Sequence, residues 1–232
     1  KITYLDLFAG AGGLSEGFAS AGYQPIAHVE MDQDACSTLK TRESFYYLKS
    51  NGMNCKYIDY LKGKITKESF YSLIPDGILN SVICETMSDK IMPSIFERID
   101  FAMESRNTDH IDLILGGPPC QAYSMAGRAR KNMEDDPRNT LYKLYFRAIE
   151  KYKPTMFVFE NVPGLLTAGN GSYLKEILSG FRARGYELDY HILNASDYGV
   201  LQNRKRIILI GWQKDSGHEY PNLKKKSKAY LV

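Results

Sequence analysis

Several common signatures are missing from this sequence. Its four cysteines, Cys36, Cys55, Cys84 and Cys120, form no Cys-x-x-Cys pair, so we expect a reducing compartment, cytoplasm or nucleus. No apolar run is long enough to cross a bilayer, none resembles a secretory leader, and no solenoid repeat is evident. The net charge of +3 is only mildly basic, so composition by itself does not indicate a nucleic-acid partner, and any basic face must be local.

What is present is an ordinary globular composition. The chain has 232 residues, of which 44% are hydrophobic and 25% charged, enough for one large α/β domain with a substantial core. It opens on Lys1 without a methionine. We therefore expect a fragment, or a chain from which segments have been removed.

One cysteine lies in an unusual setting. The β-branched run 111–115 predicts a buried parallel strand, and residues 116–124 follow it as Gly-Gly-Pro-Pro-Cys-Gln-Ala-Tyr-Ser. Open α/β sheets bind ligands at the carboxyl ends of their strands, and the two prolines disfavour helix there. A lone cysteine is more often a small buried hydrophobe, but this setting indicates that Cys120 is placed for chemistry.

A glycine-rich turn follows the first predicted strand, residues 2–8. Residues 9–13, Ala-Gly-Ala-Gly-Gly, then lead into a helix with Leu14, Phe18 and Ala21 on one face. Such loops most often bind nucleotide phosphates, but the spacing here is not Gly-x-Gly-x-x-Gly. The second predicted strand, 24–30, ends in Glu30, a carboxylate placed to accept the ribose hydroxyls of an adenosine cofactor. The alternative for Glu30 is a solvated side chain that opens the next helix.

A second cluster of polar residues is expected further along the chain. The apolar run 156–159 predicts a buried strand that ends in Glu160, Asn161, Val162, Pro163 and Gly164. After a predicted helix containing residues 174–181, residues 186–193 and 207–211 are expected to form a closing pair of strands. Between them, alternation in an extended chain places the two arginines of Gln-Asn-Arg-Lys-Arg, residues 202–206, on one face. Surface arginines usually serve solubility, but together with Glu160 they indicate a site.

These blocks, in this order, resemble the cytosine-C5 DNA methyltransferases over nearly the whole chain. The resemblance rests on the Gly-Gly-Pro-Pro-Cys-Gln loop, Asp-Leu-Phe-Ala-Gly-Ala-Gly-Gly-Leu at 6–14, Glu-Asn-Val at 160–162 and Gln-x-Arg-x-Arg at 202–206. It implies a Rossmann-like α/β fold, with a mostly parallel sheet, helices on both faces and a C-terminal antiparallel strand. It also implies methyl transfer from S-adenosylmethionine to C5 of a cytosine that is flipped out of the duplex.

The resemblance assigns roles to particular residues. Cys120 is the nucleophile that adds to C6 of the base, Glu160 is the acid at N3, and Arg206 binds O2 while Arg204 organises Glu160 or the cleft. The cofactor residues that it implies are Phe8, Ala9, Gly10, Gly12, Gly13, Leu14, Glu30, Met31, Thr86, Met87, Pro118 and Leu141. The substrate residues that it implies are Gln121, Ser124, Arg128, Asn161 and Gln202, and no metal is expected.

Residues 36–110 are less informative. The resemblance implies a third strand that ends in an acidic-apolar pair holding the adenine amino group. Residues 81–88, with the β-rich run at Val82 and Ile83, are the best candidate for it, and Asp59-Tyr60 is the alternative. We expect a helical insertion over about 51–110, with a helix over 95–103 leading back to the nucleophile strand. The arginine-rich segment 121–139 suits either a mobile loop that closes over a polyanion or a merely solvated loop.

The chain departs from the family after Trp212. The family continues there with a target-recognition domain, whereas residues 213–232 predict a basic linker that follows a catalytic domain of residues 1–212. We expect the missing recognition to lie in deleted sequence or a second subunit, in a bacterial or phage-encoded cytoplasmic enzyme with a possible cognate restriction enzyme. Two alternatives remain at this point: an RNA cytosine methyltransferase, although its Cys-Phe-Thr motif is not found, and a non-catalytic subunit that kept the fold.

Overall fold

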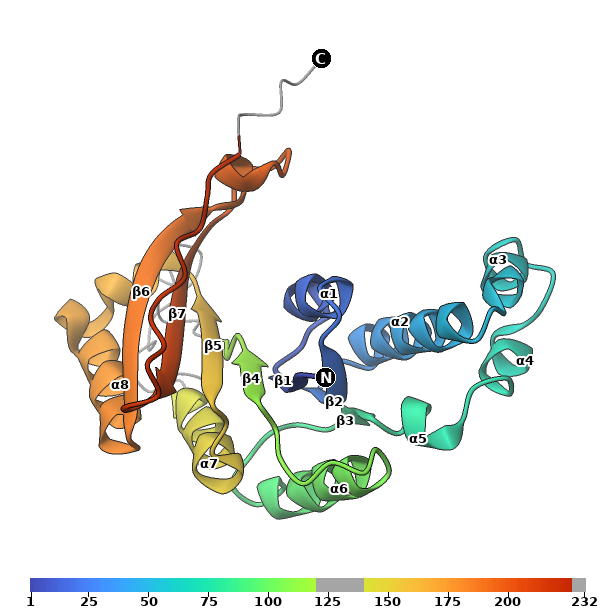
Figure 1. Cartoon of the computed structure of the whole chain (residues 1–232), viewed down its shortest axis with the longest axis horizontal. Coiled ribbons are helices and arrows are strands. Elements are labelled where there is room, and N and C mark those ends of the chain that lie inside the picture. Colours follow the sequence, from blue (N-terminus) through green and yellow to red (C-terminus); the bar gives the residue numbers. More distant parts are fainter. Residues whose placement is uncertain (120–139, 227–232) are drawn as a thin grey trace, which may run out of the picture. The chain divides into compact units, whose positions relative to one another are not determined.

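The structure is a computed structural model that describes residues 1–119 and 140–226. The chain divides into two compact units, unit 1 from Lys1 to His110 and unit 2 from Ile111 onward. Unit 1 is drawn in blue to green and unit 2 in green to red (Figure 1). We describe each unit by itself.

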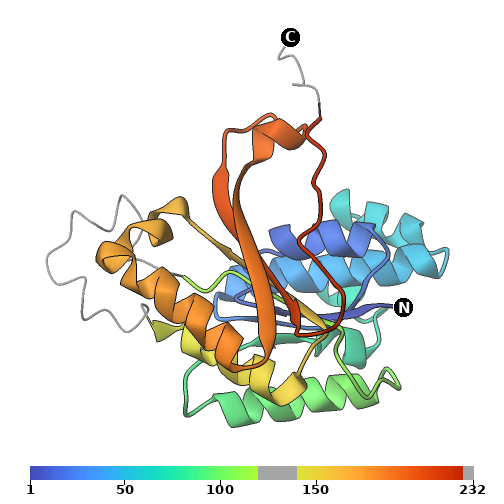
Figure 2. The same cartoon turned by 60° about the vertical axis from the view of Figure 1, so that its left-hand side comes forward.

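Unit 1 is a parallel sheet with helices on both faces. Its strands run in the order β3-β2-β1 and are all parallel; helices α1 and α2 cover one face and α6 covers the other (Figures 1 and 2). The elements are β1 (Thr3–Leu7), α1 (Gly13–Ser20), β2 (Gln24–Glu30), α2 (Gln33–Ser50), α3 (Asn54–Leu61), α4 (Lys67–Tyr71), α5 (Asp76–Leu79), β3 (Val82–Cys84) and α6 (Met92–Glu104).

Unit 2 combines one parallel and two antiparallel strand pairs. Strand β4 pairs with β5 in parallel, β5 with β7 antiparallel, and β7 with β6 antiparallel. The elements are β4 (Leu113–Gly116), α7 (Tyr142–Tyr152), β5 (Met156–Asn161), the 3-10 helices η3 (Pro163–Leu166) and η4 (Ala168–Gly171), α8 (Ser172–Ala183), β6 (Tyr186–Asn194), η5 (Ala195–Tyr198) and β7 (Lys205–Gln213). The expected mostly parallel α/β fold with an antiparallel C-terminal strand is confirmed.

The strands form where the sequence concentrates apolar and β-branched residues. Every residue of β1 and β4 is buried, as expected for parallel strands covered on both faces. By contrast, β6 alternates between buried or half-buried and exposed residues over most of its length, which is typical of a strand with one solvated face. The third strand is confirmed at Val82 and Ile83, and the alternative at Asp59-Tyr60 is wrong because both residues lie in α3.

Two expectations about helices need correction. On α1, Leu14 and Phe18 are only half-buried and Ala21 is exposed, while the buried residue is Ser15, whose hydroxyl lies 2.7 Å from the Tyr4 hydroxyl. The expected helical stretch over 51–110 is interrupted: α3, α4 and α5 lie between residues 54 and 79, β3 then pairs with β2, and α6 follows. A helix over 95–103 is confirmed as part of α6.

Aromatic packing dominates the core of unit 2. The rings of Phe157 on β5 and Phe181 on α8 stack with centroids 4.0 Å apart, and Tyr145 on α7 meets Phe181 edge-on. Gly211 is opposite Phe157 on the neighbouring strand. A Cβ atom at Gly211 would lie 2.1 Å from Phe157 Cε1, so this glycine provides the space that the ring occupies.

We predict that Gly211→Ala destabilises the chain by about 1–3 kcal/mol, because Phe157 must leave its stacked position to admit a methyl group. Urea unfolding at equilibrium measures this free energy. Gly17→Ala is the matched control: a Cβ there meets nothing within 4 Å, so better helix propensity should leave stability equal or higher. Equal stability of Gly211→Ala and wild type would contradict this account of the core.

Candidate active site

The loop after β1 has a backbone that few side chains allow. Phe8, Gly10 and Gly12 all have positive φ, at 56°, 55° and 83°, and strained non-glycine residues such as Phe8 gather at functional sites. A Cβ at Gly12 would lie 2.8 Å from Leu39 Cδ2. The loop is tied to β2 by a hydrogen bond from Ala9 N to Val29 O of 3.1 Å. The sequence therefore requires glycine here both for conformation and for close packing.

Glu30 lies at the carboxyl end of β2, next to this loop. One carboxylate oxygen, Oε2, accepts a hydrogen bond from Gly10 N at 2.8 Å. The other, Oε1, accepts from Met31 N at 2.8 Å and Asp32 N at 2.9 Å. Three backbone donors thus fix the carboxylate, which leaves about one of its roughly four acceptor positions for a ligand. A merely solvated Glu30, the alternative reading of the sequence, would not accept these three backbone hydrogen bonds.

The other expected cofactor residues of unit 1 differ in exposure. Met31 is 65% exposed, Met87 is 6% exposed, and Thr86 is exposed. Ala9 is buried, Leu14 is half-buried and Gly13 is exposed at the start of α1. Met31 and Thr86 are thus the members of this group, besides the glycine loop, with surface available to a ligand.

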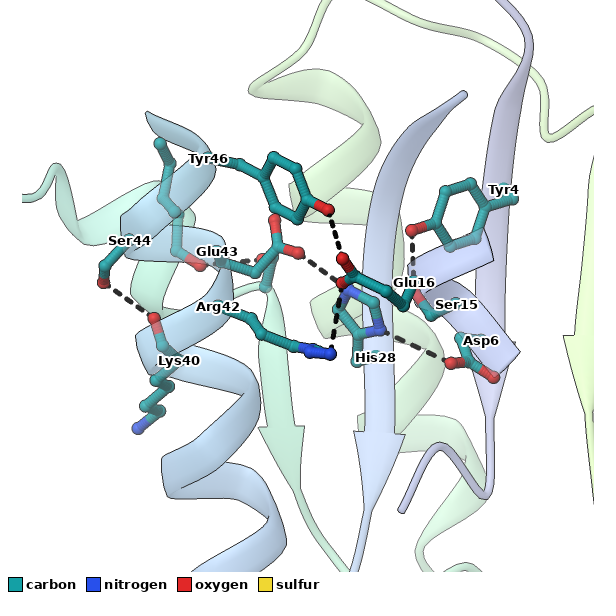
Figure 3. A network of polar contacts seen from close by, with 12 residues as sticks. Tyr4, Asp6, Ser15, Glu16, His28, Lys40, Arg42, Glu43, Ser44 and Tyr46 are labelled. Atoms are coloured by element: carbon teal, nitrogen blue, oxygen red, sulfur yellow. Dashed lines mark hydrogen bonds and ion pairs between the residues drawn. The ribbon is translucent and has the colours of Figure 1, made fainter. Parts of the chain in front are cut away.

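Charged side chains of β1, β2 and α2 form a buried network (Figure 3). His28 on β2 is 1% exposed, with Nε2 3.2 Å from Glu43 Oε1 on α2 and Nδ1 3.6 Å from Asp6 Oδ2 on β1. Burial by itself lowers the pKa of His28, but the two carboxylates outweigh burial and raise that pKa to about 9. The charged imidazolium thus joins β1, β2 and α2, and sequence spacing gave no signal for it.

In unit 2, two arginines converge on one carboxylate. Arg206 Nε lies 2.7 Å from Glu160 Oε1, and Arg204 Nη2 lies 3.9 Å from the same oxygen. Antiparallel pairing of β5 with β7, in which Glu160 is opposite Ile208, brings them together. About a quarter of the Glu160 side chain is exposed. The closer partner of Glu160 is therefore Arg206, although the sequence favoured Arg204 as its organiser.

Two neighbouring residues shape the space around Glu160. A Cβ at Gly117, just after β4, would lie 3.0 Å from Glu160 Oε2, so this glycine belongs to the site although the sequence assigned it no role. Asn161 is 4% exposed; its Nδ2 donates to Pro118 O at 3.1 Å and its Oδ1 accepts from Val162 N at 2.9 Å. The amide expected to bind substrate therefore holds the start of the Pro118 loop.

The remaining expected site residues differ in their exposure. Gln202 is exposed in the turn before β7, and Leu141 is half-buried immediately before α7. Pro118 is buried. Cys120, Gln121, Ser124 and Arg128 lie outside the described residues.

The buried Cys36 of unit 1 is not placed to act as a nucleophile. Cys36 is 3% exposed and donates from Sγ to Glu30 O at 3.4 Å. Burial, followed by the neighbouring Cys84, raises the pKa of its thiol to about 12, so it stays protonated and unreactive at neutral pH. Within residues 1–119 and 140–226, no cluster of His, Cys, Asp or Glu could hold a metal ion, and no helix there has the length and apolarity to cross a membrane.

Comparison with known proteins decides the family. The model of the C-5 cytosine-specific DNA methylases matches residues 2–90 and 80–231. The chain belongs to this family. Its resemblance to the cytosine-C5 methyltransferases, seen in the loop and strand-end motifs, is thereby confirmed.

Individual proteins that are similar to this chain are also methyltransferases. Type II methyltransferase M.Bpa9945I of Bacillus paralicheniformis is 36% identical over 95% of this chain and 56% of its own length. Type II methyltransferase M.AquIA of Picosynechococcus is 31% identical over 94% of this chain and 74% of its own length. A solved E. coli protein encoded within a prophage, described as a DNA modification methyltransferase, has a TM-score of 0.62 and 25% identity over 96% of this chain and 49% of its own. This methylase chain spans about half the length of several curated relatives that it matches.

We predict that the buried His28 makes stability depend on pH. Its pKa in the folded chain, about 9, exceeds the ordinary 6.5, so its contribution is fully present below pH 6.5 and is lost as pH rises toward 9. The difference in unfolding free energy between wild type and His28→Gln should therefore shrink across this range. Denaturant titrations at pH 6 and pH 9 measure it, and a difference that stays constant would show that His28 is not charged in the folded chain.

Proposed function

We propose that this chain carries the catalytic half of a DNA cytosine-C5 methyltransferase that uses S-adenosylmethionine. The observation that carries the proposal is the carboxylate of Glu160 held 2.7 Å from the Arg206 guanidinium, beside the strand-end glycine that leads into the loop of Cys120. An acid and a rigid donor at one edge suit the N3 and O2 atoms of a pyrimidine. Membership of the C-5 methylase family supports the same chemistry.

In the proposed reaction, the Cys120 thiolate adds to C6 of the flipped-out cytosine and forms a carbon–sulfur bond. The carboxylic acid form of Glu160 donates a proton or a strong hydrogen bond to N3, which takes up the negative charge that thiolate addition places on the ring, so C5 becomes nucleophilic. Because Glu160 is paired with Arg206, the base must share this carboxylate with the guanidinium. Arg206 then donates to O2, while Arg204 stays the outer partner of Glu160. Once C5 has taken the methyl group that a bound cofactor would supply, loss of the C5 proton to solvent and breaking of the bond between Cys120 Sγ and C6 restore the aromatic ring and free the thiolate.

The residues of unit 1 fit an adenosyl cofactor, which supplies the methyl group from its sulfonium when bound. Glu30 keeps an acceptor position for a ribose hydroxyl, and the loop around Gly10 and Gly12 lets a ligand approach the backbone closely. The exposed Met31 offers a flat apolar contact to the adenine. Phe8, Ala9, Gly13, Leu14, Thr86, Met87, Pro118 and Leu141 complete the proposed cofactor set.

The proposed substrate contacts are Gln121, Ser124, Arg128 and Gln202, with Asn161 reassigned to positioning the Pro118 loop. Relatives named Type II methyltransferases support a role in restriction and modification, in a bacterial or phage-encoded cytoplasmic enzyme with a cognate restriction enzyme. Since several of these relatives are about twice as long, we propose that target recognition lies in a further segment or second subunit.

A covalent adduct tests the chemistry directly. Incubation with S-adenosylmethionine and duplex DNA containing 5-fluorocytosine should add the mass of the DNA to the protein, because fluorine blocks the final elimination. Intact-protein mass spectrometry measures this, on the 232-residue chain and on the full-length gene product. Cys120→Ser should abolish the adduct, and an adduct that persists in Cys120→Ser, or forms only with RNA, would contradict the proposal.

We also predict that Glu160→Gln lowers the rate of methyl transfer by about 10²–10⁴-fold, the usual contribution of a general acid. The matched control is Glu176→Gln on the exposed side of α8. Single-turnover transfer of a labelled methyl group to DNA by the full-length gene product measures the rate. An unchanged rate for Glu160→Gln would remove this carboxylate from the mechanism.

A further inference from the structure

A second surface of unit 1 carries charge that the proposed reaction does not use. Residues 44–74, which include the end of α2 and all of α3 and α4, contain five lysines and two acidic residues. The segment thus has a net charge of +3, equal to the formal net charge of the whole chain. We call it the lysine–tyrosine surface; its lysines are Lys49, Lys56, Lys62, Lys64 and Lys67, and its tyrosines are Tyr46, Tyr47, Tyr57, Tyr60 and Tyr71.

The lysines of this surface are open to a ligand. All five are exposed. Lys64 Nζ is paired with Asp59 Oδ1 at 3.1 Å, and within the described ranges none of the other four has a carboxylate at ion-pair distance. Exposed ammonium groups without carboxylate partners are available to phosphate.

A pocket of about 490 Å³ opens beside these lysines. Hydroxyls of Ser37 and Thr41 and the rings of Tyr57 and Tyr60 help to line it, together with Glu16 and Arg42. The Glu16 carboxylate is paired with the Arg42 guanidinium at 3.2 Å. Lys67 Nζ donates to Ser37 Oγ at 2.5 Å, which places an ammonium group next to the pocket. Hydroxyl donors, an ammonium group and aromatic rings are the groups that proteins use to hold phosphates and sugars of nucleic acids.

The core of the insertion explains why these tyrosines stay in place. Phe70 is fully buried, and Tyr60 stacks on it with ring centroids 4.4 Å apart. Tyr57 lies 4.8 Å from the Phe45 ring. The rings therefore have fixed positions beside the pocket and offer a preorganised surface.

We propose that the lysine–tyrosine surface binds the phosphate backbone of duplex DNA, through residues that the proposed reaction does not use. S-adenosylmethionine carries no phosphate, so the proposed cofactor does not account for these charges. The chain belongs to a DNA methylase family, and a polyanion is the partner whose charge complements the surface. This inference rests on DNA being the substrate, as proposed above. The surface would add affinity for DNA of any sequence, because contacts to the phosphate backbone carry no information about the bases.

The test compares two double variants of the 232-residue chain. Lys56→Gln/Lys62→Gln removes two charges from the surface, and Lys175→Gln/Lys214→Gln removes two exposed charges from unit 2. Fluorescence anisotropy with a 25-base-pair duplex gives the dissociation constant at several salt concentrations. For Lys56→Gln/Lys62→Gln, the slope of log K against log salt should fall by about 1–2, since each lost phosphate contact contributes about 0.9. The control should keep the wild-type slope.

Thermal unfolding checks that both variants are folded. An equal fall in slope for both variants would show that only net charge matters and would overturn the proposal. So would tighter binding of an RNA duplex than of DNA through the same lysines, or no binding of DNA at any salt concentration. The 5-fluorocytosine adduct is a separate assay, so loss of the lysine effect with adduct formation intact would reject this surface and leave the proposed function standing.

Discussion

The ion pair between Glu160 and Arg206 is the interaction around which the candidate site of unit 2 is arranged. Antiparallel pairing of β5 with β7 brings the two side chains together, Gly117 leaves room for the carboxylate, and Asn161 fastens the Pro118 loop next to it. A partly exposed pair of this kind stabilises a fold by only about 0.2–1 kcal/mol. The several features that serve it are therefore better explained by the proposed chemistry than by stability.

Unit 1 also holds a carboxylate at the end of a strand, but with different hydrogen-bond partners. Glu30 also ends a buried strand, but backbone N–H groups from its own turn and from the glycine loop hold its carboxylate. In the buried His28 network, ion pairs link β2 to β1 and to α2 (Figure 3). One strand-end carboxylate thus accepts hydrogen bonds from peptide groups, and the other is paired with a guanidinium. This difference matches the proposed roles: Glu30 binds an uncharged ribose, and Glu160 acts on a base that gains a proton.

Much of this could be predicted from the sequence, because strand ends and glycine turns are local signals. The limits of β2 and the convergence of Arg204 and Arg206 on Glu160 follow from apolar runs and alternation. The buried role of Asn161 and the choice of Arg206 as the nearer partner could not be predicted, since both depend on the register between strands. The His28 network could not be predicted either, because its partners come from β1 and α2 and no local sequence pattern links them.

The most direct test of the proposed roles, Glu30 at the cofactor and Glu160 at the base, is equilibrium binding of S-adenosylmethionine to two isosteric variants. Isothermal titration calorimetry should show that Glu30→Gln weakens cofactor binding by about tenfold or more, a loss of roughly 1.4 kcal/mol. Glu160→Gln should bind the cofactor as wild type does. Unchanged affinity in Glu30→Gln, or an equal loss in both variants, would contradict the assignment of one carboxylate to the cofactor and the other to the base.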